Sequence, residues 1–172
     1  MERYLLKEPK GIRVPDIRYY NQVIDYRAFV NGQFYKIPKR SVCVLNNHPD
    51  QGLVLLRPLP LFHAEAKKSL DLFLWDLRYR EFIFLDQKEH SSERYFLPLF
   101  RRIKGSMGGK VEEGRTEVYL EEALPEDLPA VYLQTGEEFH VLLGLDLLES
   151  LMRRGLYSAR AVPVKIRYFE AE

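Results

Sequence analysis

The sequence has little cysteine, little threonine and no long apolar run. A single cysteine, Cys43, excludes an internal disulfide framework and the cysteine-rich zinc sites. Threonine occurs only as Thr116 and Thr135, and no Gly-x-Ser-x-Gly elbow is present, so catalysis by a hydroxyl nucleophile has little support. No apolar run reaches the length of a membrane span, and the start of the chain has no signal-peptide pattern. We therefore expect a soluble cytoplasmic protein.

The chain also lacks a net charge of either sign, since 26 Lys and Arg residues balance 25 Asp and Glu residues to leave +1. This excludes a uniformly basic nucleic-acid binder and a uniformly acidic tail. The charge is divided along the chain: residues 1–110 carry a net +8, residues 111–150 a net −10, and residues 151–172 a net +3. Such an asymmetry can attract a basic partner. Alternatively, the acidic and basic stretches fold against each other and their fields cancel.

Of the 172 residues, 46% are apolar and 30% are charged, which is enough for a buried core. The length predicts a single domain over residues 1–172. Strand patterns are common and helix patterns scarce, which predicts an α+β fold: a mostly antiparallel mixed sheet with one to three helices. Four of the ten glycines fall between Gly105 and Gly114. Residues 103–115 are therefore expected to form an exposed, flexible loop.

Local patterns predict several elements. Asn31-Gly32 favours a tight turn, so residues 26–37 are predicted to form a β-hairpin. Good helix formers predict a short helix over residues 63–72, followed by a strand at residues 72–75. A second helix is expected to begin at Asp146 and to end at Gly155, and a strand should follow over residues 161–168. Pro98 predicts an edge strand or a bulged one.

Side chains that could carry chemistry are sparse. The four histidines are not spaced three or four residues apart, so they form no helical metal pair, and we expect no metal and no cofactor. Cys43 lies between two valines and is expected to be a buried structural cysteine. Basic and aromatic residues alternate near Trp75, which we interpret as a strand with one solvated face and not as a nucleic-acid surface.

One motif favours an enzyme. Pro49-Asp50 followed by Glu65-Ala66-Lys67 resembles the PD-x(n)-ExK signature of metal-dependent nucleases. In that family two carboxylates hold magnesium and the lysine helps to activate water, on a strand edge. A magnesium-dependent nuclease that uses Asp50, Glu65 and Lys67 is therefore the alternative function. A further alternative is a scaffold protein whose sheet edge near Pro98 recruits another chain.

The last third of the chain resembles a known group of bacterial proteins. Residues 139–156 read as a strand and a leucine-rich helix that ends in Gly-Leu, and Ala161-Val162-Pro163-Val164 begins a final strand. Together with Pro98-Leu99-Phe100, this pattern is similar to the α+β immunity proteins that are encoded beside polymorphic toxins. The resemblance implies a non-catalytic protein that binds and neutralises a cognate toxin domain of the same cell.

The charge pattern indicates where such a partner would bind. A toxin that attacks nucleic acid tends to be basic around its active site, so an acidic surface can occupy that site and exclude substrate. Two neighbouring tyrosines are candidate anchors for the same surface. The predicted partner-binding residues are Glu112, Glu113, Glu117, Glu121, Glu122, Glu126, Asp127, Tyr119 and Tyr132.

Overall fold

The structure of the protein is a computed structural model, and it describes residues 2–19, 26–47, 52–57, 59–110, 114–156 and 159–169. Contacts divide the chain into two compact units. Unit 1 consists of Met1–Lys7, Phe100–Ser150 and Arg160–Glu172, and unit 2 consists of Glu8–Leu99 and Leu151–Ala159. The single domain that the length predicts over residues 1–172 stays a prediction.

The α+β fold class is confirmed: the strands form mixed, mostly antiparallel sheets, and the described residues include three α-helices. Among these residues no helix is both long enough and apolar enough to cross a bilayer.

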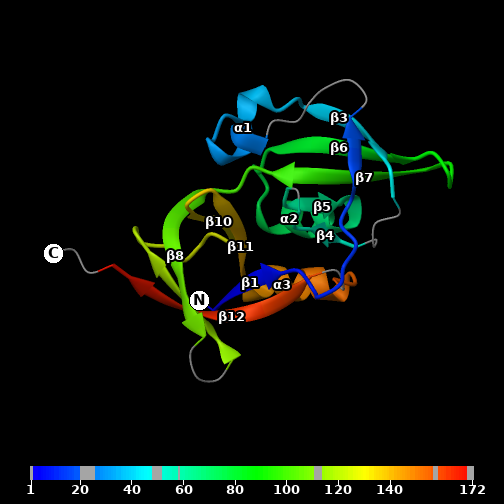
Figure 1. The fold of residues 1–172 in the computed structure, drawn as a ribbon. Coiled ribbons are helices and arrows are strands. Elements are labelled where there is room, and N and C mark those ends of the chain that lie inside the picture. Colours follow the sequence, from blue (N-terminus) through cyan, green and yellow to red (C-terminus); the bar gives the residue numbers. More distant parts are fainter. Residues whose placement is uncertain are drawn as a thin grey trace. The chain divides into compact units, whose positions relative to one another are not determined.

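Unit 1 is a closed barrel of six strands with the neighbour order β1-β11-β10-β8-β9-β12 (Figure 1). Its strands are β1 (Arg3–Lys7), β8 (Arg102–Lys110), β9 (Thr116–Leu120), β10 (Ala130–Thr135), β11 (Glu138–Gly144) and β12 (Arg160–Tyr168). The β8–β10 and β9–β12 pairs are parallel, and the other neighbours are antiparallel.

Apolar side chains from the strands, and from the segment after β9, fill the barrel. They are Leu5, Ile103, Val118, Leu120, Leu124, Val131, Leu133 and Leu142. Strand β9 illustrates the pattern, because Thr116, Val118 and Leu120 are buried and the residues between them are partly exposed. Alternate residues of a strand point to opposite faces, so one face of each barrel strand supplies the core.

A flexible loop was predicted for residues 103–115, but residues 103–110 form a strand; residues 111–113 lie outside the described residues. Residues 103–110 belong to β8, which pairs with β9 and β10. Glycine is needed at position 105 for a steric reason. A Cβ on Gly105 would lie 2.2 Å from the Tyr119 carbonyl oxygen and 2.9 Å from Cδ1 of Leu133. Glycine allows neighbouring strands of a narrow barrel to approach closely here, which is a packing role.

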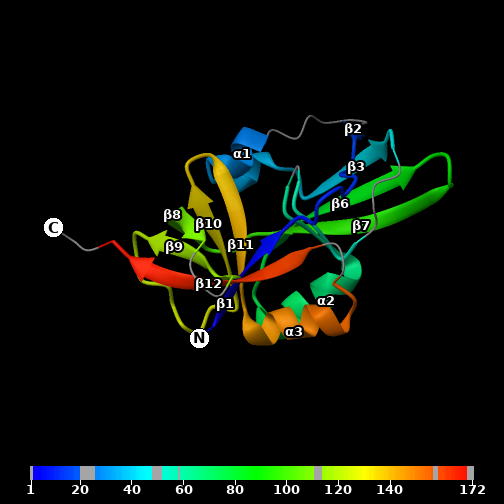
Figure 2. The same ribbon diagram turned by 60° about the horizontal axis from the view of Figure 1, so that its bottom comes forward.

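Unit 2 contains a six-stranded sheet with the order β2-β3-β6-β7-β5-β4. Its strands are β2 (Ile17–Tyr19), β3 (Arg40–Leu45), β4 (Val54–Leu55), β5 (Leu61–His63), β6 (Tyr79–Asp86) and β7 (Ser91–Pro98). Strands β6 and β7 form a long antiparallel hairpin, which Figure 2 shows clearly. Because β7 lies between β6 and β5, it is not an edge strand, and the scaffold alternative loses the edge that it needed.

The predicted hairpin over residues 26–37 is wrong. The chain forms helix α1 (Tyr26–Val30) and a short 3-10 turn (Phe34–Lys36) there. Gly32 has a φ of 70°, and the Gln33 N–H donates to the Ala28 carbonyl oxygen at 2.8 Å. This bond closes the helix end in a Schellman arrangement. The glycine supplies the positive φ that was predicted, but it ends a helix and not a hairpin turn.

Two other helices agree better with the sequence patterns. Helix α2 (Ala64–Phe73) begins after His63, whose ring accepts a hydrogen bond from the Glu65 N–H at 3.2 Å. It runs on to Phe73, so the strand predicted at residues 72–75 is wrong. Helix α3 (Leu145–Arg153) ends before Gly155, as predicted, and β12 forms the predicted last strand.

A carboxylate in unit 2 makes the stability pH-dependent. Glu81 of β6 is 8% exposed and accepts hydrogen bonds from Arg40 and Arg94, each at 2.6 Å. Burial disfavours the ionised carboxylate, but the two guanidinium groups outweigh burial and hold the pKa of Glu81 below its ordinary value. Ionised Glu81 therefore stabilises the folded state above the pKa of an unfolded glutamate, and this stabilisation is lost as the pH falls through the lower folded pKa.

We expect Glu81→Gln to lower the free energy of unfolding by about 1–2 kcal/mol at pH 7, because two charge-assisted hydrogen bonds are weakened. The difference from the parent protein should shrink as the pH falls below about 4.3. Urea unfolding between pH 3 and pH 7 measures both quantities. Glu138→Gln, at a carboxylate that is 81% exposed and lies 3.8 Å from His140, should have a much smaller effect on stability. A Glu81 difference that is constant over this pH range would contradict the role of the ionised group.

Candidate functional site

Four of the predicted acidic residues lie on one exposed segment of unit 1. Residues 121–127 follow β9, and we call them the acidic segment. Its exposed acidic side chains are Glu121, Glu122, Glu126 and Asp127. Glu122 lies 3.5 Å from Arg101, and both side chains are about half exposed, so this ion pair contributes little to stability. Glu112 and Glu113 lie outside the described residues.

The acidic segment is attached to the barrel by a buried side chain and by backbone hydrogen bonds. Leu124 is 9% exposed and belongs to the barrel core, and the Glu121 N–H donates to the Lys104 carbonyl oxygen at 3.0 Å. Directly after the segment, the Gly144 N–H donates to the Pro129 carbonyl oxygen at 2.8 Å. The acidic side chains are thus carried on a backbone with fixed ends and a buried centre.

Arg3 of β1 binds the same stretch of backbone. Its side chain is buried, and its guanidinium donates to the carbonyl oxygens of Leu128, of Pro125 at 3.1 Å and of Glu126 at 3.4 Å. Burial lowers the pKa of Arg3, and the nearby Tyr168 and Asp127 oppose this shift in part. An arginine keeps its proton at physiological pH even so. A buried cation therefore binds three carbonyl groups of residues 125–128, in and directly after the acidic segment.

Glu117 and Tyr119 are already engaged within unit 1. The Glu117 carboxylate accepts hydrogen bonds from Arg167 and from the Tyr119 hydroxyl, both at 2.9 Å. These bonds, from Arg167 first and Tyr119 second, lower the pKa of Glu117. Its side chain is only 14% exposed. The Tyr119 ring also packs against Phe169, with 5.9 Å between ring centroids. Both residues therefore flank the acidic segment and serve mainly the packing of the strands.

Tyr132 cannot anchor a partner, and this part of the prediction is wrong. Its side chain is fully buried and packs against the rings of Phe100 and Phe139, at centroid distances of 5.0 and 6.0 Å. The four residues Ala130–Leu133 are all buried, so both faces of this part of β10 are covered. The sequence placed Tyr132 near the acidic residues, but it did not show which side chains cover the tyrosine.

Sequence reasoning missed two features. The first is Arg3, which looked like an ordinary charged residue near the start of the chain. The second is an exposed apolar surface in unit 2, where Leu72 and Trp75 are 71% and 89% exposed and Phe73 is partly exposed. Such neighbouring apolar groups mark interaction surfaces. A helical period over residues 64–73 would have found Leu72, because it falls away from the buried residues Ala66 and Leu70.

The residues of the nuclease alternative are engaged elsewhere. Asp50 lies outside the described residues. Glu65 binds Lys68 at 2.7 Å, and Lys67 binds Asp71 at 2.6 Å, so both residues form ion pairs within α2 and neither lies on a strand edge. Within the described ranges no group of three or more His, Cys, Asp or Glu side chains could hold a metal ion. The nuclease stays a prediction without a supporting contact.

Cys43 is a free cysteine on β3 and is fully buried, as predicted. Burial raises the pKa of its thiol to about 12, so the reactive thiolate is scarce at neutral pH. The cysteine is therefore a structural residue of the sheet core.

The arrangement at the acidic segment suits recognition of a basic surface, because exposed carboxylates sit on a backbone that is already ordered. Comparisons of the chain with models of protein families, with curated proteins and with solved structures found no match.

Proposed function

We propose that the protein is a non-catalytic immunity protein that binds a basic toxin domain of the same cell through the acidic segment. The observation that carries the proposal is the exposure of four carboxylates on a backbone that the buried Arg3 holds in place. The kind of partner comes from the resemblance of residues 139–164 and of Pro98-Leu99-Phe100 to immunity proteins. The charge of the segment supplies the physical reason for binding.

The proposed binding has two components. Exposed acids raise the local concentration of a basic partner and speed its association, and salt screens this effect. The fixed backbone reduces the conformational entropy that is lost on binding. A toxin whose cationic active site is covered by the acidic segment can no longer take up its own anionic substrate. No catalytic step by this chain is needed.

The test pairs two variants that change the net charge equally. Glu121→Lys with Glu126→Lys reverses two charges on the acidic segment. Glu137→Lys with Glu138→Lys reverses two exposed charges at the turn between β10 and β11. The C-terminal domain of the neighbouring open reading frame is expressed in bacteria, alone and with each form of this protein. Growth and the association rate constant at several salt concentrations are measured.

We expect the parent protein and the turn variant to restore growth. The acidic-segment variant should lose rescue, and its association should slow by about tenfold or more at low salt. If both variants behave alike, the position of the acids is irrelevant and the proposed surface is wrong. If the neighbouring domain is harmless, or if the parent protein does not relieve its toxicity, the immunity function is wrong.

A further inference from the structure

Part of the sheet in unit 2 turns one face toward solvent. The parallel pairing of β3 with β6 and the antiparallel pairing of β6 with β7 place Arg40 beside Glu81, and Ile83 between Val42 and Arg94. Side chains of paired residues, and of alternate residues along a strand, lie on the same face. Arg40, Val42 and Arg94 are exposed, whereas the residue between the named positions on each of β3 and β6 is buried. The face that carries the arginines is therefore the one open to solvent.

Arg40 and Arg94, which we call the arginine pair, share one carboxylate on this face. Their Nε groups donate to different oxygens of Glu81, each at 2.6 Å. The Glu81 side chain is only 10% exposed, but those of Arg40 and Arg94 are 65% and 58% exposed. Within the described ranges, the structure gives the terminal amino groups of both guanidinium groups no hydrogen-bond partner. Each guanidinium therefore keeps donors for a ligand.

The arginine pair and Glu81 together carry a surplus of one positive charge, because one ionised carboxylate balances two guanidinium groups. Arg57 of the same unit provides a contrast. It is 67% exposed and donates through Nε to Glu8 at 2.6 Å, so these two residues form a neutral pair. An anion beside the arginine pair gains a net attraction, whereas at Arg57 the charge of Glu8 opposes it. The surplus therefore distinguishes the arginine pair from an ordinary surface ion pair.

Both guanidinium groups are positioned before any ligand binds. Glu81 holds each of them at Nε, and the Arg94 guanidinium also lies over the Phe96 ring, 5.4 Å from its centroid. A side chain that is already ordered loses less conformational entropy on binding. A planar guanidinium binds a carboxylate through two parallel N–H donors. A single carboxylate also neutralises the surplus charge, so the arginine pair suits a ligand of charge −1.

Aliphatic side chains lie directly beside the arginine pair. Val42 is 37% exposed, and its cross-strand neighbour Ile83 is partly exposed, as is Leu85 further along β6. A ligand that covers them needs apolar groups next to its carboxylate. An acidic residue with aliphatic neighbours, in a segment of another protein, has this combination of groups.

A nucleic acid fits this face less well, although a phosphodiester also has a charge of −1. Binding of single strands relies on aromatic rings on which the bases stack. Phe96, the ring on this face nearest to Arg94, is only 8% exposed. Lys67 and Arg94 both lie over it, each 5.4 Å from the ring centroid. These cations leave little of the ring for a base.

A second copy of this chain is also a poor occupant. Its acidic segment carries exposed carboxylates that could reach an arginine. The large apolar side chain between those acids, Leu124, is only 9% exposed, however, because it belongs to the barrel core. The acidic segment therefore offers charge without an aliphatic side chain that could cover Val42 and Ile83.

We propose that the exposed face of β3, β6 and β7 binds a segment of another protein through a carboxylate of that segment, which the arginine pair holds. Aliphatic neighbours of the carboxylate cover Val42 and Ile83. The terminal amino groups of Arg40 and Arg94 supply the hydrogen bonds, and Glu81 positions both arginines without touching the ligand. This interaction uses no residue of the acidic segment and needs no toxin, so it stands apart from the proposed immunity function.

The probe is a short blocked peptide with one glutamate between valines, titrated into the isotope-labelled full chain. Backbone amide signals and the Nε–H signals of the arginines are followed by NMR. We expect a Kd below about 1 mM, with shifts at residues 40–42 and 81–83 and in the Nε–H signals of Arg40 and Arg94. The control peptide has glutamine in place of glutamate. It should bind about tenfold more weakly, because it brings no charge to the arginine pair.

Two lysine variants separate the arginine pair from general attraction. Arg40→Lys keeps the charge and a donor for Glu81 but loses the planar guanidinium, so peptide affinity should fall about fivefold. Arg57→Lys, at a similarly exposed arginine in a neutral pair, should leave affinity unchanged. Urea unfolding establishes that both variants are folded. If Arg40→Lys does not fold, the glutamine peptide and the arginine signals of the parent protein still decide the outcome.

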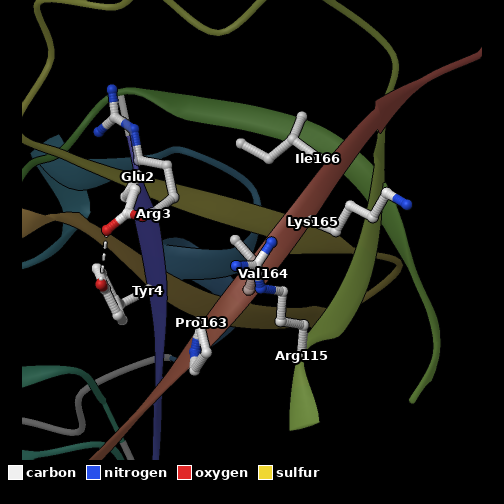
Figure 3. Close-up of a pocket in the computed structure, with 8 residues that line it drawn as sticks. All are labelled: Glu2, Arg3, Tyr4, Arg115, Pro163, Val164, Lys165 and Ile166. Atoms are coloured by element: carbon white, nitrogen blue, oxygen red, sulfur yellow. Dashed lines mark hydrogen bonds between the residues drawn. The ribbon is translucent and has the colours of Figure 1, made fainter. Parts of the chain in front are cut away.

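Unit 1 contains an internal comparison for non-specific attraction. Arg115 and Lys165 line a pocket there together with Glu2 (Figure 3). A peptide drawn only by positive charge would shift signals of this pocket as much as those of the arginine pair. That result would overturn the proposal, as would equal affinities of the glutamate and glutamine peptides. Tighter binding of a single-stranded oligonucleotide to the same residues would overturn it in favour of a nucleic-acid partner.

Discussion

Gly105→Ala is expected to lower the free energy of unfolding by about 4 kcal/mol, the largest loss that we foresee for a single methyl group in this protein. The new Cβ would lie 2.2 Å from the Tyr119 carbonyl oxygen, which belongs to the backbone of β9. A backbone atom cannot turn aside as a side chain can. Strands β8 and β9 would therefore have to separate, and the barrel core would lose packing.

The same strand offers two graded controls. At Gly109 no atom lies within 4 Å of an added Cβ, so Gly109→Ala should leave stability unchanged or raise it slightly. At Gly108 the nearest atoms belong to the side chains of Glu117 and Tyr119, each at 3.0 Å, so we expect an intermediate loss. Urea unfolding of the three variants gives the order. Equal effects at Gly105 and Gly109 would indicate a loop and contradict the barrel.

The glycines of β8 illustrate why this strand was not predictable from the sequence. Turns and mobile loops are also rich in glycine, and the composition of residues 103–110 does not separate the two cases. What decides between them is how closely β9 passes Gly105, which depends on residues that are distant in the sequence. In contrast, α3 was predictable, because a local apolar stripe and the glycine that follows it define the helix.

In the candidate site too, some features follow from the local sequence, and others depend on residues that are far apart in the chain. The exposure of the acids in residues 121–127 follows from their charge, which any reading of the sequence finds. The burial of Tyr132 depends on Phe100 and Phe139, which cover a face of β10 that would otherwise be solvated. The role of Arg3 depends on a partner 125 residues away in the chain, at Leu128. No periodicity or local motif carries information of that kind.

Arg3→Met should lower the free energy of unfolding by about 2–3 kcal/mol. Methionine keeps much of the buried volume, but it leaves the carbonyl groups of Pro125, Glu126 and Leu128 without the charged donor. The acidic segment should also become less ordered. The amides of residues 121–129 should therefore exchange with solvent faster than they do in the parent protein, and the increase should be larger than that in β9. Urea unfolding and hydrogen exchange measure the two effects.

Two further variants identify what Arg3 contributes. Tyr4→Phe removes only the exposed hydrogen bond to Glu2, so it should cost less than about 0.5 kcal/mol. Arg3→Lys keeps the positive charge but cannot spread its donors over three carbonyl groups as a planar guanidinium does, so its stability should fall between those of the parent and the methionine variant. If the lysine variant matched the parent, the charge alone would be sufficient and the fixed geometry of the acidic segment would have another origin. If Arg3→Met left exchange in residues 121–129 unchanged, the ordered backbone on which the proposed binding surface depends would be supported by Leu124 and the segment ends alone.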